Sequence, residues 1–181
     1  MSVNIWHSAR TLYNQDIRKR KSKRRMTMTD NNTMINAMIS NMISWAEGRI
    51  GNTDYAGRCL SFIEDALEKS NDIEIFGGDC AKESCEMYHD ALLTGLPEKG
   101  AFVFCNCLCP SDEGLMNWGH CGISLGDGNA IHTWNKVRIN GYPEIEKLTA
   151  LTGDHPKYIG WVPIERVVEW HIHSIKHKVT V

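Results

Sequence analysis

The stretch "GHCGISLGDGNAIHTWNKVRI", residues 119–139, carries the strongest structural signal in the chain. Two alternating runs flank a Gly-Asp-Gly turn, and this pattern predicts a β-hairpin. A three-residue loop would pair Gly122 with His132, so that His120 and His132 lie diagonally on one face, roughly 7 Å apart. A two-residue loop would put the histidines on opposite faces. Two surface histidines in a hairpin remain the alternative to a functional pair.

The chain before residue 100 has helical periodicity instead. Residues 33–51 place Met, Ile and Trp side chains at near-helical spacing, most simply for core packing, and Gly51 can end this helix. An amphipathic helix is expected from Cys59 to about Glu68, with apolar residues at positions 60, 63 and 67. A further helix is expected from about Ala81 to Leu93.

The chain after residue 100 favours strands. The segment "GAFVFCNCLC", residues 100–109, is a candidate strand rich in Phe, Val and Cys. Residues 158–181 contain one or two more strand runs, with Pro163 inside a strand or at its edge. Because the helices come first and the strands later, the expected fold class is α+β rather than alternating α/β.

Cys59 begins its expected helix, directly after the turn-like segment "TDYAG", residues 53–57. Unpaired backbone N–H groups and the positive end of the helix dipole favour a thiolate at such a position. A nucleophilic cysteine also needs a nearby base, and His120 lies on the hairpin face shared with Gly122 and Ser124, where small residues leave room for a ligand. The alternative for Cys59 is a buried thiol facing the core.

The segments "YAGRCLSFIEDAL" and "GHCGISLGDGNAIHTW" together resemble the NlpC-type family of cell-wall cysteine peptidases, papain-like domains related to the CHAP amidases. The resemblance covers about residues 33–165. It implies a papain-like α+β fold with N-terminal helices, in which the helix that bears the nucleophile packs on an antiparallel sheet. Cys59 matches the nucleophile, His120 the base and His132 the group that orients the base.

The resemblance implies hydrolysis of peptide or amide bonds in peptidoglycan through a thioester on Cys59. We expect substrate contacts from Asp54 and Tyr55, before the cysteine, and from Trp118 and Trp134, which flank the histidines; core packing is the alternative for the two tryptophans. The sequence departs from the family at three positions. Arg58 replaces the usual Asp or Asn, Leu60 the usual Ser or Gly, and Cys121 the common Val.

The chain has seven cysteines, and three of them, Cys105, Cys107 and Cys109, would share one face of a single strand. Packing of small residues is the simplest interpretation, followed by a disulfide and then by a metal site, because C-x-C-x-C lacks the usual zinc spacing. A non-catalytic, thiol-rich metal-binding or interaction module is therefore an alternative function. An intracellular acyltransferase or deamidase on the same fold is another. No cofactor is expected.

Charge is distributed unevenly along the 181 residues. Residues 1–25 carry eight Lys or Arg and one Asp, a net charge of +7, which leaves −9 on the remainder. We expect a basic, disordered tail at 1–30 and one catalytic domain at 31–181. The acidic body argues against nucleic acid as a partner, and no apolar run is long enough for a membrane span.

Location and partners follow from the same sequence features. No signal peptide is visible, so we expect cytoplasmic synthesis, with release or non-standard export if the substrate is the cell wall. The expected partner is peptidoglycan or a related peptide. The oligomeric state is not indicated by the sequence. Three histidines near the C-terminus, at positions 171, 173 and 177, fit an exposed strand or tail better than a metal site.

Overall fold

A computed structural model of the protein describes residues 30–112 and 114–169. The expected disordered tail and the histidines at positions 171, 173 and 177 lie outside the described residues. Residues 30–47 are helical and cross the boundary between two compact units, Met1–Ala37 and Met38–Val181. The sheets and the other helices belong to the second unit, which contains all of the candidate site residues.

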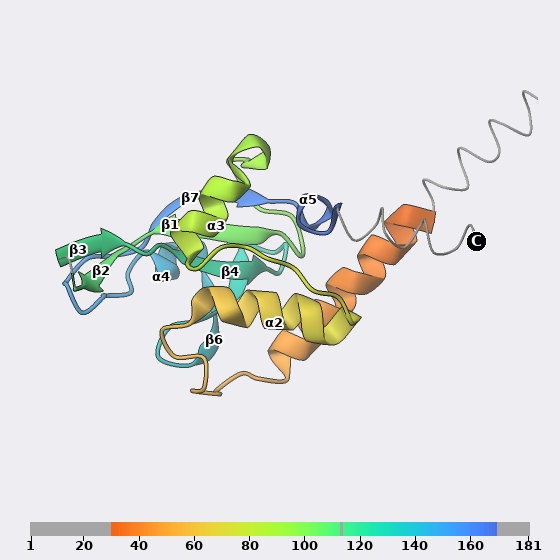
Figure 1. Ribbon diagram of the computed structural model, residues 1–181. Helices are drawn as coiled ribbons and strands as arrows, with labels where there is room; N and C mark the ends of the chain where they lie inside the picture. The colour runs from red at the N-terminus through yellow and green to blue at the C-terminus, as the bar shows by residue number, and fades with distance from the viewer. Residues whose placement is uncertain (1–29, 113, 170–181) are drawn as a thin grey trace, which may run out of the picture. The chain divides into compact units, whose positions relative to one another are not determined.

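The second unit is an α+β structure built on a five-stranded antiparallel sheet (Figure 1). The strand order is β6-β5-β4-β1-β7. The bounds are β1 Phe102–Asn106, β4 His120–Ser124, β5 Asn129–Thr133, β6 Val137–Gly141 and β7 Lys157–Val162. The predicted α+β class is therefore confirmed.

The hairpin of β4 and β5 has the predicted register. Gly122 pairs with His132, and Ser124 pairs with Ala130 across the turn. Nearly all residues of both strands are buried, because α2 packs on the two strands and Ile145 packs against Ala130. The predicted second run is divided, however, since the chain turns after Thr133 and residues 137–141 form β6, which pairs with β5.

Two helices pack on the sheet in Figure 1: α2, Cys59–Asn71, against β4 and β5, and α3, Ala81–Met87, against β1 and β4. The apolar face of α2 is buried as its periodicity predicted. The helix ends where Asp72 adopts a left-handed conformation and its N–H bonds to Glu68 O. The prediction that α3 extends to Leu93 is wrong. Tyr88 leaves helical geometry, and the 3₁₀ turn η1, His89–Ala91, follows.

Residues 100–109 do not form the single predicted strand. The chain leaves the main sheet after Asn106, and β2, Leu108–Ser111, pairs with β3, Gly114–Asn117, in a separate two-stranded sheet. The strand breaks here because two side chains accept backbone hydrogen bonds from it. The Cys107 N–H donates to Asn117 Oδ1 at 2.9 Å, and the Leu108 N–H donates to Asp154 Oδ2 at 2.8 Å. These bonds replace the strand ladder at the break.

The C-terminal strand prediction is confirmed for its first run, while residues 170–181 lie outside the described residues. β7 forms as expected, but Pro163 ends it and serves as the N-cap of a short helix, α5, Ile164–Val167. A four-residue helix, α4, Tyr142–Ile145, follows β6. Within the described ranges, no helix is both long and apolar enough to cross a bilayer.

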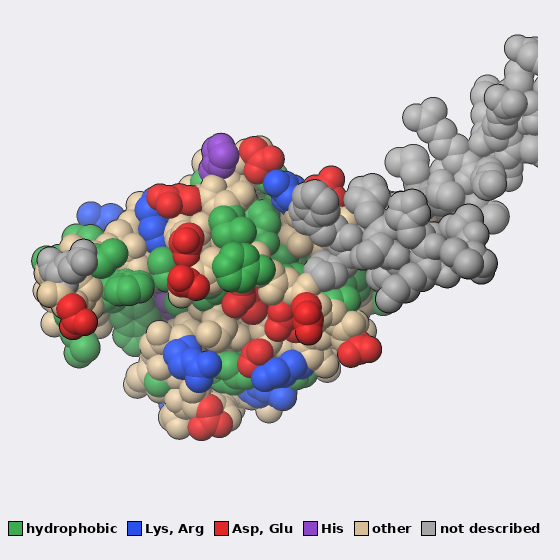
Figure 2. Space-filling view, viewed as in Figure 1, with side chains coloured by type: hydrophobic (Ala, Val, Ile, Leu, Met, Phe, Trp, Pro, Cys, Tyr) green, Lys and Arg blue, Asp and Glu red, His purple; other side chains and the backbone are tan. Residues whose placement is uncertain are grey.

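Apolar side chains gather at the surface over β2 and β3, as Figure 2 shows. Leu108, Leu115 and Met116 of this small sheet are exposed, and Trp118, which follows β3, is 40% exposed. The candidate site lies next to this surface.

Candidate active site

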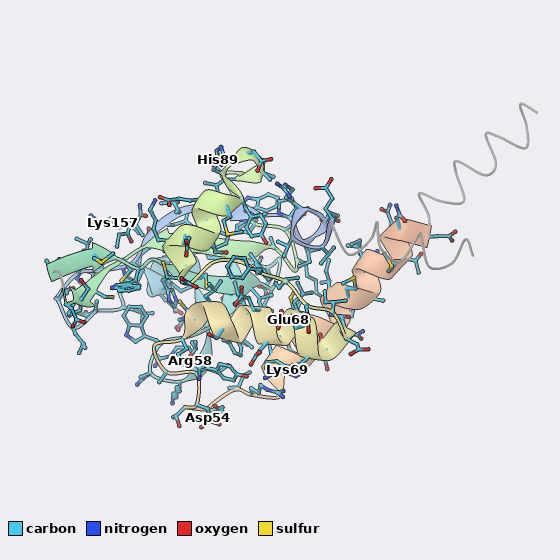
Figure 3. All side chains as sticks on the ribbon, viewed as in Figure 1. Asp54, Arg58, Glu68, Lys69, His89 and Lys157 are labelled. Atoms are coloured by element: carbon cyan, nitrogen blue, oxygen red, sulfur yellow. The ribbon has the colours of Figure 1, made fainter. Side chains whose placement is uncertain are left out.

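Cys59 is the first residue of α2, and its thiol is partly buried. Arg58 is the N-cap residue, beside the start of the helix in Figure 3, and it makes no side-chain capping hydrogen bond. The first N–H groups of a helix have no acceptor within the helix, and together they present a partial positive charge. An Asp or Asn at position 58 would bond to these groups. Arg58 leaves them available to a ligand.

His120 and His132 are in direct contact. His120 Nε2 lies 2.9 Å from His132 Nδ1, and the ring centroids are 5.0 Å apart at 86°. The two side chains are 3% and 0% exposed, which rules out the interpretation as surface histidines. Gly122 explains how they meet: a methyl group at this position would lie 3.0 Å from His132 Cβ and 3.1 Å from the Ile131 carbonyl oxygen.

The side chains of Cys121 and His120, which are consecutive at the start of β4, act on the Cys59 thiol. The hydrogen bond from the Cys121 thiol contributes most to holding the pKa of Cys59 well below its usual value. Burial opposes this effect, while the charge of His120 and hydrogen bonds from His120 and the Cys121 backbone add to it. Burial raises the pKa of Cys121 itself, so this residue remains a donor beside a thiolate.

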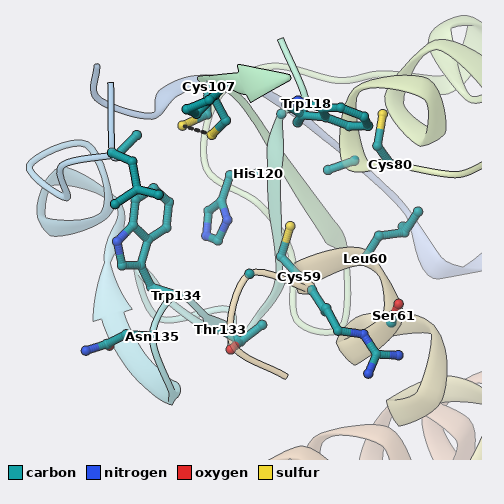
Figure 4. A pocket seen from close by; sticks show the side chains of 18 of the residues that line it. Cys59, Leu60, Ser61, Cys80, Cys107, Trp118, His120, Thr133, Trp134 and Asn135 are labelled. Atoms are coloured by element: carbon teal, nitrogen blue, oxygen red, sulfur yellow. Dashed lines mark hydrogen bonds between the residues drawn. The ribbon is translucent and has the colours of Figure 1, made fainter. Parts of the chain in front are cut away.

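A cavity of about 690 Å³ opens in front of Cys59 and His120 (Figure 4). Trp118 and Trp134 both line it, as predicted from their places beside the histidines. The Trp134 ring also packs edge-on against His120, with centroids 5.1 Å apart, and so helps to fix the imidazole. Cys59, His120 and the two tryptophans are therefore brought together by the fold.

Asp54 and Tyr55 do not occur among the described residues that line the cavity. Tyr55 donates its hydroxyl hydrogen to Asp65 Oδ2 at 2.6 Å, and its ring packs on Trp45 and Phe62. Asp54 lies in the loop before α2 (Figure 3), where its backbone N–H and side chain bond to Asn52. Both residues shape the approach to the helix rather than the cavity wall.

Three polar contributors were not anticipated. Cys121 was assigned no part in catalysis from the sequence, although alternation on β4 gave it a definite face. Asn140 Oδ1 lies 3.2 Å from His132 Nε2, and Asn140 Nδ2 donates to Glu144 Oε2 at 3.0 Å. No local signal marks Asn140, because its contact with His132 depends on a third strand that the periodicity did not separate.

The remaining thiols are placed differently. Cys105 packs with Ala130 and Ile145 in the core, whereas Cys107 and Cys109 line the cavity with their sulfur atoms 3.9 Å apart. The three thiols therefore do not share one strand face, because the strand is broken at Cys107. Among the described residues, no group of three or more His, Cys, Asp or Glu side chains is arranged to hold a metal ion.

No family model matches the sequence, and no curated protein matches it. Function is therefore inferred from the residues and the geometry of the chain itself.

Proposed function

We propose that the protein is a cysteine-dependent hydrolase of amide or peptide bonds with a papain-like fold of the NlpC type. The observation that supports this most directly is the alignment of three side chains. Cys59 begins α2 at the cavity, His120 lines the same cavity and its charge favours the Cys59 thiolate, and His132 Nδ1 contacts His120 Nε2 at 2.9 Å. Nucleophile, base and orienting group are thus connected in the order that acyl transfer requires.

In the first half of the reaction, His120 takes the Cys59 proton and the thiolate attacks the carbonyl carbon of the substrate. The oxyanion that forms faces the N–H groups at the start of α2, which Arg58 does not cap. His120 then gives its proton to the leaving nitrogen, the C–N bond breaks, and an acyl thioester remains on Cys59. His120 next accepts a proton from water, which attacks the thioester and releases the acid and the thiol.

The substrate class proposed is the stem peptide of peptidoglycan, an assignment that rests on the sequence motifs. The cavity is compatible with a peptide or glycan chain, because Trp118 and Trp134 offer flat apolar surfaces on either side of His120. Hydrolysis within the stem peptide would make the protein an endopeptidase. Hydrolysis at the glycan–peptide link would make it an amidase.

Digestion of purified peptidoglycan, with the products identified by mass spectrometry, tests this proposal. Wild type should release defined fragments, Cys59→Ala should release none, and Cys107→Ala should retain activity because it removes a cavity thiol outside the catalytic set. The mass of the fragments separates endopeptidase from amidase. Absence of fragments with wild type would refute the cell-wall substrate, and a rapidly alkylated Cys59 in the same sample would then leave an acyltransferase or deamidase as the function.

A further inference from the structure

The hydrogen bonds at His120 continue beyond His132 to the outer strand of the hairpin. His132 Nε2 lies 3.2 Å from Asn140 Oδ1, and Asn140 Nδ2 donates to Glu144 Oε2 at 3.0 Å. Asn140 pairs with Ala130, two residues before His132 on β5, so its side chain is on the same face of the sheet. The series runs from α4 through β6 and β5 to β4 and ends at the cavity.

The direction of each bond can be assigned from the Glu144 end. The hydrogen bond from Asn140, together with that from the Gly141 N–H, holds the pKa of the Glu144 carboxyl below its usual value, so the group is an ionised acceptor. Asn140 must turn its NH₂ group toward this carboxylate. Its carbonyl oxygen then faces His132, and because a carbonyl oxygen only accepts, His132 Nε2 carries the hydrogen.

The position of the hydrogen on each of the two imidazole rings follows in the same way. Burial, with the charge of His120 adding to it, lowers the pKa of His132 to about 3, so the ring is neutral and has a single N–H. With that hydrogen on Nε2, Nδ1 of His132 can only accept, and His120 Nε2 must be the donor across the 2.9 Å contact. The remaining nitrogen of a neutral His120, Nδ1, is then without hydrogen and is the one available to Cys59.

We propose that Glu144 and Asn140 are positioning residues that select the tautomer of His120 and thereby direct its basic nitrogen, Nδ1, to Cys59. The inference rests on the proposed role of His120 as the base. Asn140 also keeps the Glu144 charge one side chain away from His132, so that His132 orients its neighbour without itself becoming charged. Without this control His120 would divide between two tautomers, and only the one with bare Nδ1 can accept the thiol proton.

A structural explanation of Glu144 has to be separated from this role, because the carboxylate also accepts the Gly141 N–H at the start of α4. Glu146 provides the matched control. It follows α4 directly, and its Oε1 accepts the N–H of Tyr158 at 3.0 Å, but it has no place in the series that leads to His120.

The first experiment measures the tautomers by nitrogen-15 NMR of the histidine rings in full-length Cys59→Ser protein, in which no thiolate can charge His120. Both His120 and His132 should be in the Nε2–H form, and Glu144→Ala should convert His120 to a mixture. Glu146→Ala should leave the spectrum unchanged. A His120 in the Nδ1–H form, or a spectrum insensitive to Glu144→Ala in a folded protein, would overturn the proposal.

The second experiment measures the iodoacetamide reaction of Cys59 at pH 6–7. Asn140→Leu and Glu144→Ala should each slow it by roughly tenfold, the lower end of what a positioned base contributes. The double variant should be no slower than Asn140→Leu alone, because the two residues act in series, whereas independent effects would multiply and would contradict the proposal. Glu144→Gln should recover part of the rate. These readouts need no peptidoglycan, so a failed cell-wall assay leaves the inference standing.

Discussion

Two walls of the same cavity carry cysteines with opposite properties. On one wall, Cys59 at the start of α2 has a pKa well below its usual value. On the other, burial and the neighbouring Cys109 raise the pKa of Cys107 to about 12. Both residues line the cavity in Figure 4, but Cys59 is partly exposed whereas Cys107 is 1% exposed, and burial is the largest cause of the raised pKa of Cys107.

The difference comes from what surrounds each sulfur atom. Cys59 has donors on several sides: the helix start, the Cys121 thiol and His120. Cys107 faces another thiol at 3.9 Å and the negative charge of Asp154, both of which disfavour a thiolate. Reactivity in this cysteine-rich chain is therefore set by burial together with local donors and charges, and the comparison can be tested by changing the donors and charges one at a time.

Removal of the nucleophile should have the largest effect. Cys59→Ser should reduce alkylation of the protein by iodoacetamide at pH 6 by about 100-fold or more, because it removes the thiol whose pKa is held well below its usual value. Cys107→Ser should leave the initial rate unchanged. Mass spectrometry of the labelled peptides measures both, and rapid labelling of Cys107 in wild type would contradict the comparison.

Removal of the base should have the next largest effect. His120→Ala takes away a hydrogen bond and a positive charge from the Cys59 thiolate, so alkylation at pH 6 should slow by about 10- to 100-fold. His89→Ala, in the exposed turn η1, is the control. Equal rates for the two variants would mean that Cys121 and the helix start activate Cys59 without His120.

Replacement of the neighbouring thiol should have a smaller effect. Cys121→Val removes the donor that contributes most to the low pKa of Cys59, so the midpoint of its pH–rate profile should move upward. The rate at pH 6 should then fall a few-fold, while the plateau at high pH should be unchanged. Cys85→Val, at another buried thiol, should leave the midpoint in place. An unchanged midpoint in Cys121→Val would assign the activation to His120 and the helix.

The smallest effect concerns stability rather than reactivity, one turn further along α2. Burial raises the pKa of Glu64 from 4.5 to about 7, so the native state favours the neutral acid and loses stability as the pH rises through this window. Glu64→Gln should abolish that loss, so at pH 8 the variant should be more stable than wild type by about 1 kcal/mol. This value is smaller than the full pKa shift would give, because the carboxyl group is partly exposed and solvent screens its charge. Chemical unfolding at pH 5 and pH 8 measures the difference, with Glu68→Gln as the control. If Glu64→Gln changed the free energy of unfolding by the same amount at pH 5 and at pH 8, the assignment would be contradicted.

The sequence by itself determined the elements whose causes are local. The periodicity of residues 59–68 is sufficient to predict α2, and it places Cys59 at the helix start, because apolar spacing and the preceding turn act within a few residues. The Gly-rich turn likewise sets the register of β4 and β5, and the register brings His120 to His132. These features already indicate Cys59, His120 and His132 as the proposed nucleophile, base and orienting group.

Only the tertiary structure decided which side chains surround them. Asn140 on β6 contacts His132, and Glu144 on α4 accepts a hydrogen bond from Asn140. Cys121 acts on Cys59 where β4 packs on α2. Tyr55 bonds to Asp65 instead of lining the cavity. The break at Cys107 depends on acceptors at positions 117 and 154. Each of these contacts joins residues of different helices, strands or loops, and a one-dimensional pattern does not encode which partner on another element will satisfy a donor or an acceptor.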